Sequence, residues 1–405
     1  MKMRAAGSFI FGVVLVMVEG LAIAPGVKAQ VTDGKKPQLP APFASKSVNN
    51  SPEEAKTPKG FLPTVPAGFR INIFAADFKG PRWLTVAPNG DIFLADMGAG
   101  KVIILRDPQR TGSAQENELF AGGINEPYGI VFHDDYVYVG ATNALLRFKY
   151  DPKTSKRNGE AEKLMDLPTG GHSTRSLSLA PDGKHLLVGV GSESNISIEA
   201  DTRRGAITIC DLDGKNARLY ATGLRNATGL GLEPTTKMVW TSVNERDGLG
   251  NDLPPDYFSS VKDGGFYGWP YSYIGDNVDP RVKPQKPELV AKATVPDVLL
   301  GAHRAPLQFG FYTGKEFPES YRGGAFVAEH GSWNRAPRAG YQVVFVPFKN
   351  GKASGDPVPF LTGLVPDPEK SEVYGRPVGV VMAPDGSLLV SDDTAGVVYR
   401  VSVAK

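Results

Sequence analysis

The stretch Ser176–Val190, with the sequence SLSLAPDGKHLLVGV, decides the fold of this chain. Serine and leucine alternate before the central Pro181-Asp182-Gly183, as in a strand with one buried face. Pro-Asp-Gly is typical of a tight turn between antiparallel strands, and a second apolar run follows it. The stretch therefore predicts a β-hairpin of two short strands.

The same hairpin pattern recurs at 83–96, 128–140, 229–243 and 378–392. The turns are centred on Pro88, His133, Pro181, Pro234 and Pro384. They are 45, 48, 53 and 150 residues apart, and each of the first three intervals has the length of one four-stranded propeller blade. The long interval has room for two blades, with a weaker copy at 309–312 and 325–328. We therefore expect an all-β fold, a six-bladed β-propeller of four-stranded antiparallel blades.

A β-sandwich is the main alternative fold, but its turns recur about every 8 to 12 residues, far more often than the turns found here. No stretch has the period of a substantial amphipathic helix, which disfavours a βαβ nucleotide-binding fold. The glycine-rich nucleotide motifs, the G-x-S-x-G elbow and the H-E-x-x-H zinc motif are all absent from the sequence.

Composition excludes further classes of protein. The 405 residues include 45 Lys+Arg and 43 Asp+Glu, and this near balance argues against a nucleic-acid binder. The 47 glycines and 33 prolines suit short strands joined by many turns. The single cysteine, Cys210, excludes an intramolecular disulfide, a C-x-x-C-H haem site and any cysteine-rich metal site.

The N-terminal region predicts export. Residues 1–29 read as a signal peptide, with Lys2 and Arg4 before an apolar run and cleavage expected after Ala29; a retained membrane anchor is the alternative. We expect a periplasmic or secreted protein with no membrane span after cleavage. Residues 30–60 are polar and proline-rich and predict a flexible leader, so that 61–405 forms the single propeller domain.

In a propeller, the residues that precede the first strand of each blade gather on one rim of the central channel. These positions are Arg82, Asn125-Glu126, His172 to Arg175, Arg225-Asn226, His303-Arg304 and Arg376. Four arginines, Arg82, Arg175, Arg225 and Arg376, would make this rim a receptor for an anion. The alternative is that these arginines are solvated surface groups.

Histidines on this rim are candidates for chemistry. His172 follows Gly170-Gly171, where the backbone can approach a ligand, and imidazole is a suitable general base near neutral pH. A purely structural or exposed loop histidine is the alternative. His303, His330 and Arg335 belong to the region with insertions and are candidate substrate contacts.

Two further segments carry polar or aromatic groups. Residues 244–252, NERDGLGND, have the oxygen donors and glycines of a calcium loop but not the register of an EF-hand, and an ordinary polar turn is equally consistent. Residues 264–273, GGFYGWPYSY, suit either a wall on which a sugar stacks or packing between blades.

Taken in order, these segments carry a family resemblance. The motifs are GHSTRSL at 171–177, GLRN at 223–226, NERD at 244–247, GGFYGWPY at 264–271, GAH at 301–303, HGSWNR at 330–335 and GRPVGV at 375–380. From about Pro66 to Val403 the chain resembles bacterial periplasmic sugar dehydrogenases that depend on pyrroloquinoline quinone (PQQ). It is closer to L-sorbosone dehydrogenase-like proteins and more distantly similar to soluble glucose dehydrogenase.

The resemblance implies PQQ over the channel mouth and a Ca²⁺ ion beside it. His172 matches the general base, Arg225 and Asn226 match contacts to the quinone, and Arg376 matches a contact to cofactor or substrate. The backbone carbonyls of Asp247 and Gly248 match the calcium turn. The implied reaction is oxidation of an aldose or aldehyde sugar, with an external cytochrome or quinone as electron acceptor.

One departure from that family concerns His172. The glucose dehydrogenase branch has a carboxylate that supports the base, but this chain has Gly191-Ser192 at that position, so His172 needs another partner. Two other functions stay open. One is a propeller lactonase with a channel metal held by Asp96, Glu329 and Asn226, and the other is a sugar-binding propeller without catalysis.

Overall fold

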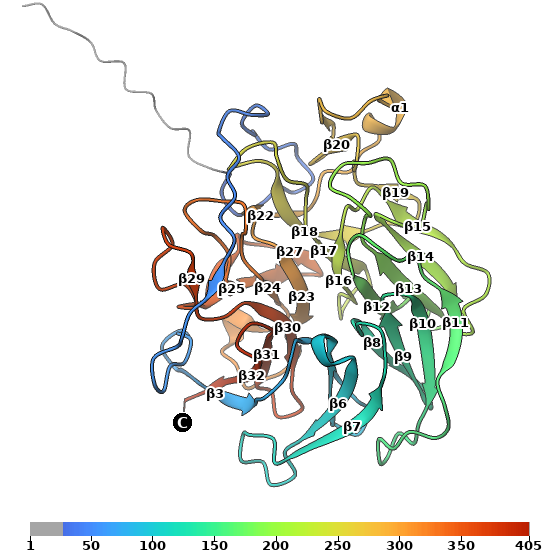
Figure 1. Ribbon diagram of the computed structural model, residues 1–405, viewed down its shortest axis with the longest axis vertical. Helices are drawn as coiled ribbons and strands as arrows, with labels where there is room; N and C mark the ends of the chain where they lie inside the picture. The colour runs from blue at the N-terminus through green and yellow to red at the C-terminus, as the bar shows by residue number, and fades with distance from the viewer. Residues whose placement is uncertain (1–26, 405) are drawn as a thin grey trace, which may run out of the picture.

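The computed structural model describes residues 27–404, and in this part the chain forms six β-sheets, whose four main strands are antiparallel, arranged as the blades of a propeller (Figure 1). Blade one contains β4 (Pro81–Val86), β5 (Ile92–Asp96), β6 (Lys101–Arg106) and β7 (Glu116–Gly122). Blade two contains β8 (Ile130–His133), β9 (Tyr136–Ala141), β10 (Ala144–Lys149) and β11 (Glu162–Asp166). Blade three contains β12 (Arg175–Leu179), β13 (His185–Val190), β14 (Ala206–Asp211) and β15 (Arg218–Thr222), with β19 (Gly265–Phe266) added at its edge.

The second half of the chain builds the remaining blades. Blade four contains β16 (Ala227–Leu232), β17 (Val239–Val243), β18 (Pro255–Val261) and β22 (Val298–Ala302), with β1 (Gln30–Val31) at its edge. Blade five contains β23 (Pro306–Phe311), β24 (Ala325–Glu329), β25 (Gln342–Val346) and β28 (Val358–Leu361). Blade six contains β30 (Pro377–Met382), β31 (Leu388–Asp392), β32 (Val397–Val403) and β3 (Phe69–Ala75).

Several short elements lie outside the main strands of the blades. They are the strand pairs β2 (Glu53–Glu54) with β29 (Glu372–Val373), β20 (Ser272–Tyr273) with β21 (Asn277–Val278), and β26 (Phe348–Lys349) with β27 (Lys352–Ala353), the helix α1 (Pro287–Val290) and the 3₁₀ turns Met97–Ala99 and Glu319–Tyr321. No helix of the described residues is long and apolar enough to cross a membrane.

The predicted six-bladed propeller is confirmed. The inner strands β4, β8, β12, β16, β23 and β30 contact one another in a ring, and most of their labels surround the centre of Figure 1. The ring is closed by β3, which comes early in the chain but pairs with β32, so that Phe69 lies opposite Val403. This closure holds the two ends of the domain in one sheet.

The predicted turns join the first and second strands of their blades. In blade three, Gly183 N donates to Ala180 O over 2.9 Å, and Gly183 has the positive φ of 67° that this turn requires. Each inner strand therefore runs from the rim that carries His172 to the rim that carries these turns. All residues just before the inner strands share the first rim, which we call the upper rim.

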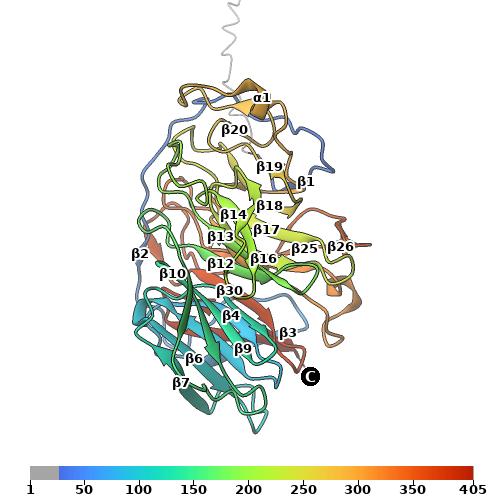
Figure 2. The same cartoon turned by 90° about the vertical axis from the view of Figure 1, so that its right-hand side faces the viewer.

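Residues 30–60 differ from the predicted flexible leader. They lie along the outside of the propeller, where β1 pairs with β22 and β2 pairs with β29 (Figure 2). Between these strands, Phe43 N donates to Leu249 O over 2.7 Å. Backbone pairing with the blades holds this segment, and its polar composition gave no sign of such partners. The predicted signal peptide, 1–29, lies almost entirely outside the described residues.

Candidate active site

The loop before β12 presents His172 on the upper rim with one nitrogen fixed. Its Nδ1 lies 2.8 Å from the carbonyl oxygen of Ser192, and its backbone N donates to the same oxygen over 3.0 Å. A carbonyl oxygen only accepts, so Nδ1 carries the proton and Nε2 keeps its lone pair. Ser192 Oγ, 3.2 Å from Nδ1, donates to Ser194 O instead. The partner that His172 needs in place of a carboxylate is thus the backbone carbonyl of Ser192.

His172 is held as a neutral imidazole. Burial, followed by the nearby positive charge of Arg225, lowers the pKa of His172 to about 4. The ring is therefore unprotonated at neutral pH, with Nε2 available to accept a proton. Among the described residues, no hydrogen-bond partner reaches Nε2.

Arg225 and Asn226 lie beside His172, at the start of blade four. Arg225 is buried and donates from Nη1 to Glu245 O over 2.7 Å and from Nε to Asn195 O over 3.2 Å. Asn226 is also buried, and its Oδ1 has no hydrogen-bond partner within the described residues. A buried amide oxygen without a partner costs free energy, which a ligand with a donor would recover.

Gly191 lies where blades three and four meet. A Cβ built on Gly191 would lie 2.3 Å from Asn226 Oδ1 and 2.6 Å from His172 Cβ. The side chains of His172 and Asn226 therefore approach each other over a residue that has no side chain. The structure brings together His172 of the third repeat with Arg225 and Asn226 of the fourth, as predicted from their positions on the rim.

A second cluster on the upper rim is organised by Asp393. Its carboxylate accepts from His330 Nε2 over 2.9 Å and from Arg82 Nη1 over 2.7 Å. Arg376 lies next to this pair and donates from Nε and Nη2 to the carbonyls of His330 and Gly331, each over 3.0 Å. His330 is thus linked to a carboxylate, and Arg376 is placed beside it through the backbone.

Electrostatics in this second cluster favour the ion pair of Arg82 and Asp393. Burial, followed by the charge of Arg376, lowers the pKa of His330 to about 4. Burial alone would raise the pKa of Asp393, but His330 and Arg82 outweigh it and hold that pKa well below its usual value. Asp393 was not predicted as a site residue. It directly follows the second strand of the last repeat, β31, and so lies on the same rim as Arg376.

The loop from His330 to Arg338 connects the two clusters. At its start His330 contacts Asp393, and further along Asn334 Nδ2 donates to Asp247 Oδ1 over 2.5 Å. Arg335, predicted as a substrate contact, forms an ion pair with Asp252 at 2.8 Å. Its guanidinium thus holds two loops together.

Arg175 does not reach the rim surface. Its side chain is fully buried, and it donates to four carbonyl oxygens, those of Thr142, Pro168, His172 and Thr174. The structure thus differs from the predicted cofactor contact. Arg175 is the first residue of β12, and its guanidinium holds the loop of His172 against loops that follow strands of blade two.

At the predicted calcium turn, one of the two carbonyl oxygens is already fully hydrogen-bonded by the protein. The carbonyl oxygen of Asp247 accepts from Asn195 Nδ2 over 2.9 Å and from Arg281 Nη1 over 2.8 Å, which uses both of its lone pairs. His303, predicted as a substrate contact, is buried beneath this turn with Nε2 2.9 Å from Gly250 O and Nδ1 3.5 Å from Asp247 Oδ1.

The metal site of the lactonase alternative is not formed. Asp96, Glu329 and Asn226 lie on blades one, five and four, and Glu329 is paired with Arg304 at 3.6 Å and Gln342 at 2.8 Å. Within residues 27–404, no group of three or more His, Cys, Asp or Glu side chains has the arrangement of a metal site.

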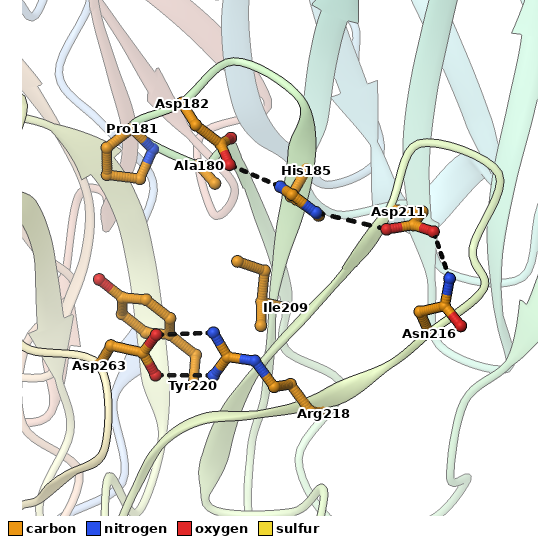
Figure 3. Close-up of a pocket in the computed structure, with 10 residues that line it drawn as sticks. All are labelled: Ala180, Pro181, Asp182, His185, Ile209, Asp211, Asn216, Arg218, Tyr220 and Asp263. Atoms are coloured by element: carbon orange, nitrogen blue, oxygen red, sulfur yellow. Dashed lines mark hydrogen bonds and ion pairs between the residues drawn. The ribbon is translucent and has the colours of Figure 1, made fainter.

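A surface pocket of about 390 Å³ lies at the other rim, beside the blade-three hairpin (Figure 3). His185 lies between Asp182 and Asp211, with contacts of 2.6 and 3.3 Å. Arg218 donates two hydrogen bonds to the carboxylate of Asp263, over 2.7 and 2.6 Å. These side chains are already paired with one another, so this pocket is a weaker candidate than the upper rim.

Comparison with known proteins supports the architecture. A protein of Borreliella burgdorferi described as uncharacterized is 27% identical over 356 residues, covering 84% of this chain and 91% of that protein. A pyrroloquinoline quinone-dependent pyranose dehydrogenase of Coprinopsis cinerea is 24% identical over 396 residues, covering 82% of this chain. This chain spans only 53% of the length of the Coprinopsis relative.

The solved structures show the same fold. The holo form of the pyranose dehydrogenase PQQ domain from Coprinopsis cinerea has a TM-score of 0.73 at 23% identity, covering 87% of this chain and 99% of that domain. Residues 63–254 and 281–404 match the TrAA12-like family and contain every upper-rim residue described above. The chain therefore belongs to the TrAA12-like family.

Proposed function

We propose that this chain is a PQQ-dependent dehydrogenase that oxidises an aldose or an aldehyde sugar. The observation that carries the proposal is the neutral His172, whose Nε2 is free beside the buried Arg225 and Asn226. The names of the Coprinopsis relative and of its PQQ domain support the choice of cofactor and of a sugar substrate.

The donors on the upper rim fit the chemistry of PQQ, a planar quinone with three carboxylates. Arginine pairs well with planar carboxylates, and Arg376 has an Nη1 with no partner among the described residues. Asn226 Oδ1 lacks a donor, and Arg225 Nη2 has only a loose contact, 3.7 Å from Asp247 Oδ2. Bound PQQ would supply the two-electron acceptor that the side chains of this protein lack.

In this proposal His172 accepts the proton of the sugar hydroxyl at Nε2. The fixed Nδ1–H keeps the ring orientation, and the Ser192 carbonyl stabilises the positive charge that forms on the imidazole. Arg225 stabilises negative charge that develops on an oxygen next to it, which is effective because the guanidinium is buried. The two residues come from neighbouring blades, so the propeller fixes their separation.

Three finer points belong to the same proposal. The substrate is of the glucose or sorbosone type, the reduced protein passes its electrons to an external cytochrome or quinone, and the protein works in the periplasm after loss of residues 1–29. Export rests on the charged and apolar pattern of those residues. The proposed reaction uses no calcium ion, because Asn195 and Arg281 fill the acceptor positions of the Asp247 carbonyl.

The test separates cofactor binding from chemistry. Purified protein is titrated with PQQ, and dye reduction is followed over a panel of sugars at saturating PQQ. Arg225→Ala and Arg376→Ala should weaken PQQ binding by roughly 10- to 100-fold, because each removes a charge-assisted contact. His172→Ala should leave PQQ binding within a few-fold and lower kcat by at least about 100-fold.

Arg218→Ala is the matched control, because Arg218 is an arginine of blade three that pairs with Asp263 away from the upper rim. It should change neither PQQ binding nor kcat. If His172→Ala keeps near-normal kcat while the two arginine variants bind PQQ normally, the proposal is refuted. The non-catalytic sugar-binding propeller would then be the better interpretation.

A further inference from the structure

The guanidinium of Arg281 lies at the turn where the family resemblance places calcium. Arg281 follows β21, and it donates from Nη1 to the carbonyl oxygen of Asp247 over 2.8 Å. A Cβ built on Gly248 would lie 2.8 Å from the same Nη1, so the guanidinium rests directly against the Asp247-Gly248 turn. A fixed positive charge of the protein therefore occupies this position.

Asp279 anchors Arg281 in this place. Its carboxylate, which is fully buried, accepts from Arg281 Nε over 3.0 Å and from Nη2 over 2.8 Å. This two-point contact fixes the plane of the guanidinium and directs Nη1 to the turn. Asp279 lies between the two segments that match the family, 63–254 and 281–404, so the anchor comes from a stretch outside that match.

Asn195 completes the enclosure of the turn. Its side-chain amide donates to Asp247 O over 2.9 Å and accepts from Asp247 N over 2.8 Å. The carbonyl oxygen therefore receives two N–H donors, from Asn195 and Arg281. A calcium ion, which takes 6 to 8 oxygen ligands, would have to displace at least one of them.

The Asp247 carboxylate is also in use. Arg225 Nη2 is 3.7 Å from Oδ2, Asn334 Nδ2 is 2.5 Å from Oδ1, and His303 Nδ1 is 3.5 Å from Oδ1. His303 Nε2 is in turn 2.9 Å from Gly250 O, so the imidazole is held in place beneath the turn. A guanidinium, an amide and an imidazole thus surround this carboxylate, and a second guanidinium, that of Arg281, contacts the carbonyl oxygen of the same residue. A divalent cation at this turn would have to displace these groups.

We propose that Arg281 takes the place of the calcium ion in this chain, so that the upper rim binds its cofactor without calcium. The positive charge that a metal would bring to the turn is supplied by a side chain with a fixed anchor. The part of this inference that concerns PQQ rests on the proposed function, whereas the part that concerns calcium does not.

The first experiment measures calcium alone. Protein treated with a chelator is titrated with CaCl₂ by calorimetry, with no PQQ present. We expect no saturable uptake of one Ca²⁺ per chain below about 1 mM, the weak end of protein calcium sites. The proposal would be overturned if the protein takes up one Ca²⁺ per chain and if Arg281→Gln alters this uptake while the control variant Arg203→Gln does not.

The second experiment measures PQQ binding, followed by quenching of tryptophan fluorescence, in EGTA and in CaCl₂. The dissociation constant of the natural protein should differ by less than about two-fold between the two conditions, and a difference above about ten-fold would contradict the proposal. Arg281→Gln should weaken PQQ binding in EGTA by about 10-fold, and unchanged binding would equally contradict it.

Arg203→Gln is the matched control. Arg203 makes the same contact with a carboxylate two residues earlier, since Asp201 accepts from its Nε over 3.0 Å and from its Nη2 over 2.7 Å. Its Nη1 donates to Asp166 O, outside both clusters of the upper rim, so its loss should leave PQQ binding within about two-fold. If no variant and no condition gives PQQ binding, the proposed function fails, and the calcium titration of the natural protein still decides the inference.

Discussion

Replacing Gly191 with alanine should disturb the site at the point where His172 and Asn226 meet. The added methyl group would lie 2.3 Å from Asn226 Oδ1 and 2.6 Å from His172 Cβ, whereas ordinary contacts begin at about 3.4 Å. The φ of Gly191 lies outside the left-handed region, so alanine fits the backbone and the effect is purely steric. One or both side chains must retreat by about 1 Å.

The size of the effect follows from that displacement. Overpacking of this kind costs about 1 to 3 kcal/mol of stability. A shift of about 1 Å in a reacting group lowers turnover by roughly 100-fold. Movement of His172 would also weaken the contact of Nδ1 with Ser192 O, which fixes the protonated nitrogen. We therefore expect kcat to fall by about 100-fold while the protein still folds.

The assay compares Gly191→Ala with Gly122→Ala. Gly122 is also outside the left-handed region, and a Cβ there would meet nothing closer than 3.9 Å. Dye reduction with saturating PQQ gives kcat, and urea unfolding gives the free energy of unfolding. The Gly122 variant should match the natural protein in both. Turnover of Gly191→Ala within about three-fold of normal would refute the inferred contact between the two blades.

Three further outcomes follow from the charges on the upper rim. His172 has a pKa of about 4 in the folded chain, against about 6.5 when unfolded, so its contribution to stability is complete above pH 6.5 and is lost as the pH falls towards 4. Urea unfolding without cofactor gives the free energy of unfolding of the natural protein and of His172→Asn. The difference between the two should rise by about 2 to 3 kcal/mol from pH 4 to pH 7. A difference that does not change with pH would contradict the burial assigned to His172. Asp393→Asn should lower the free energy of unfolding by about 3 kcal/mol, because Arg82 and His330 lose a partner that is mostly shielded from solvent. Asp385→Asn weakens a pair with Arg400 in which the carboxylate is exposed, so it should cost less than about 1 kcal/mol. Equal losses would show that the exposure of the carboxylate does not matter here. Arg175→Met should lower the free energy of unfolding by about 3 to 5 kcal/mol, because four carbonyl oxygens lose a donor. The PQQ affinity of the folded fraction should change by less than about three-fold. A large loss of affinity with unchanged stability would show that Arg175 is a cofactor contact after all.

Features that depend on neighbouring residues could be read from the sequence. Alternation of apolar residues and the Pro-Asp-Gly turns depend on local backbone preferences. Their spacing defined six blades, including blade five, whose hairpin lies inside the long interval. Because every first strand of a propeller starts on the same rim, the position of His172, Arg225 and Arg376 before such strands was enough to place them on it.

The partners of these residues were decided by the tertiary structure. Ser192 O, Asp393 and Arg281 come from loops whose approach to His172, His330 and Asp247 follows no period in the sequence. The same holds for residues 30–60, which pair through backbone groups that every residue has. Arg175 shows the limit most clearly, since an arginine at a rim position points outward or inward according to the register of its strand. Hydrogen-bond partners distant in the chain are fixed only when the blades close into a ring, and composition contains no signal of which loops then meet.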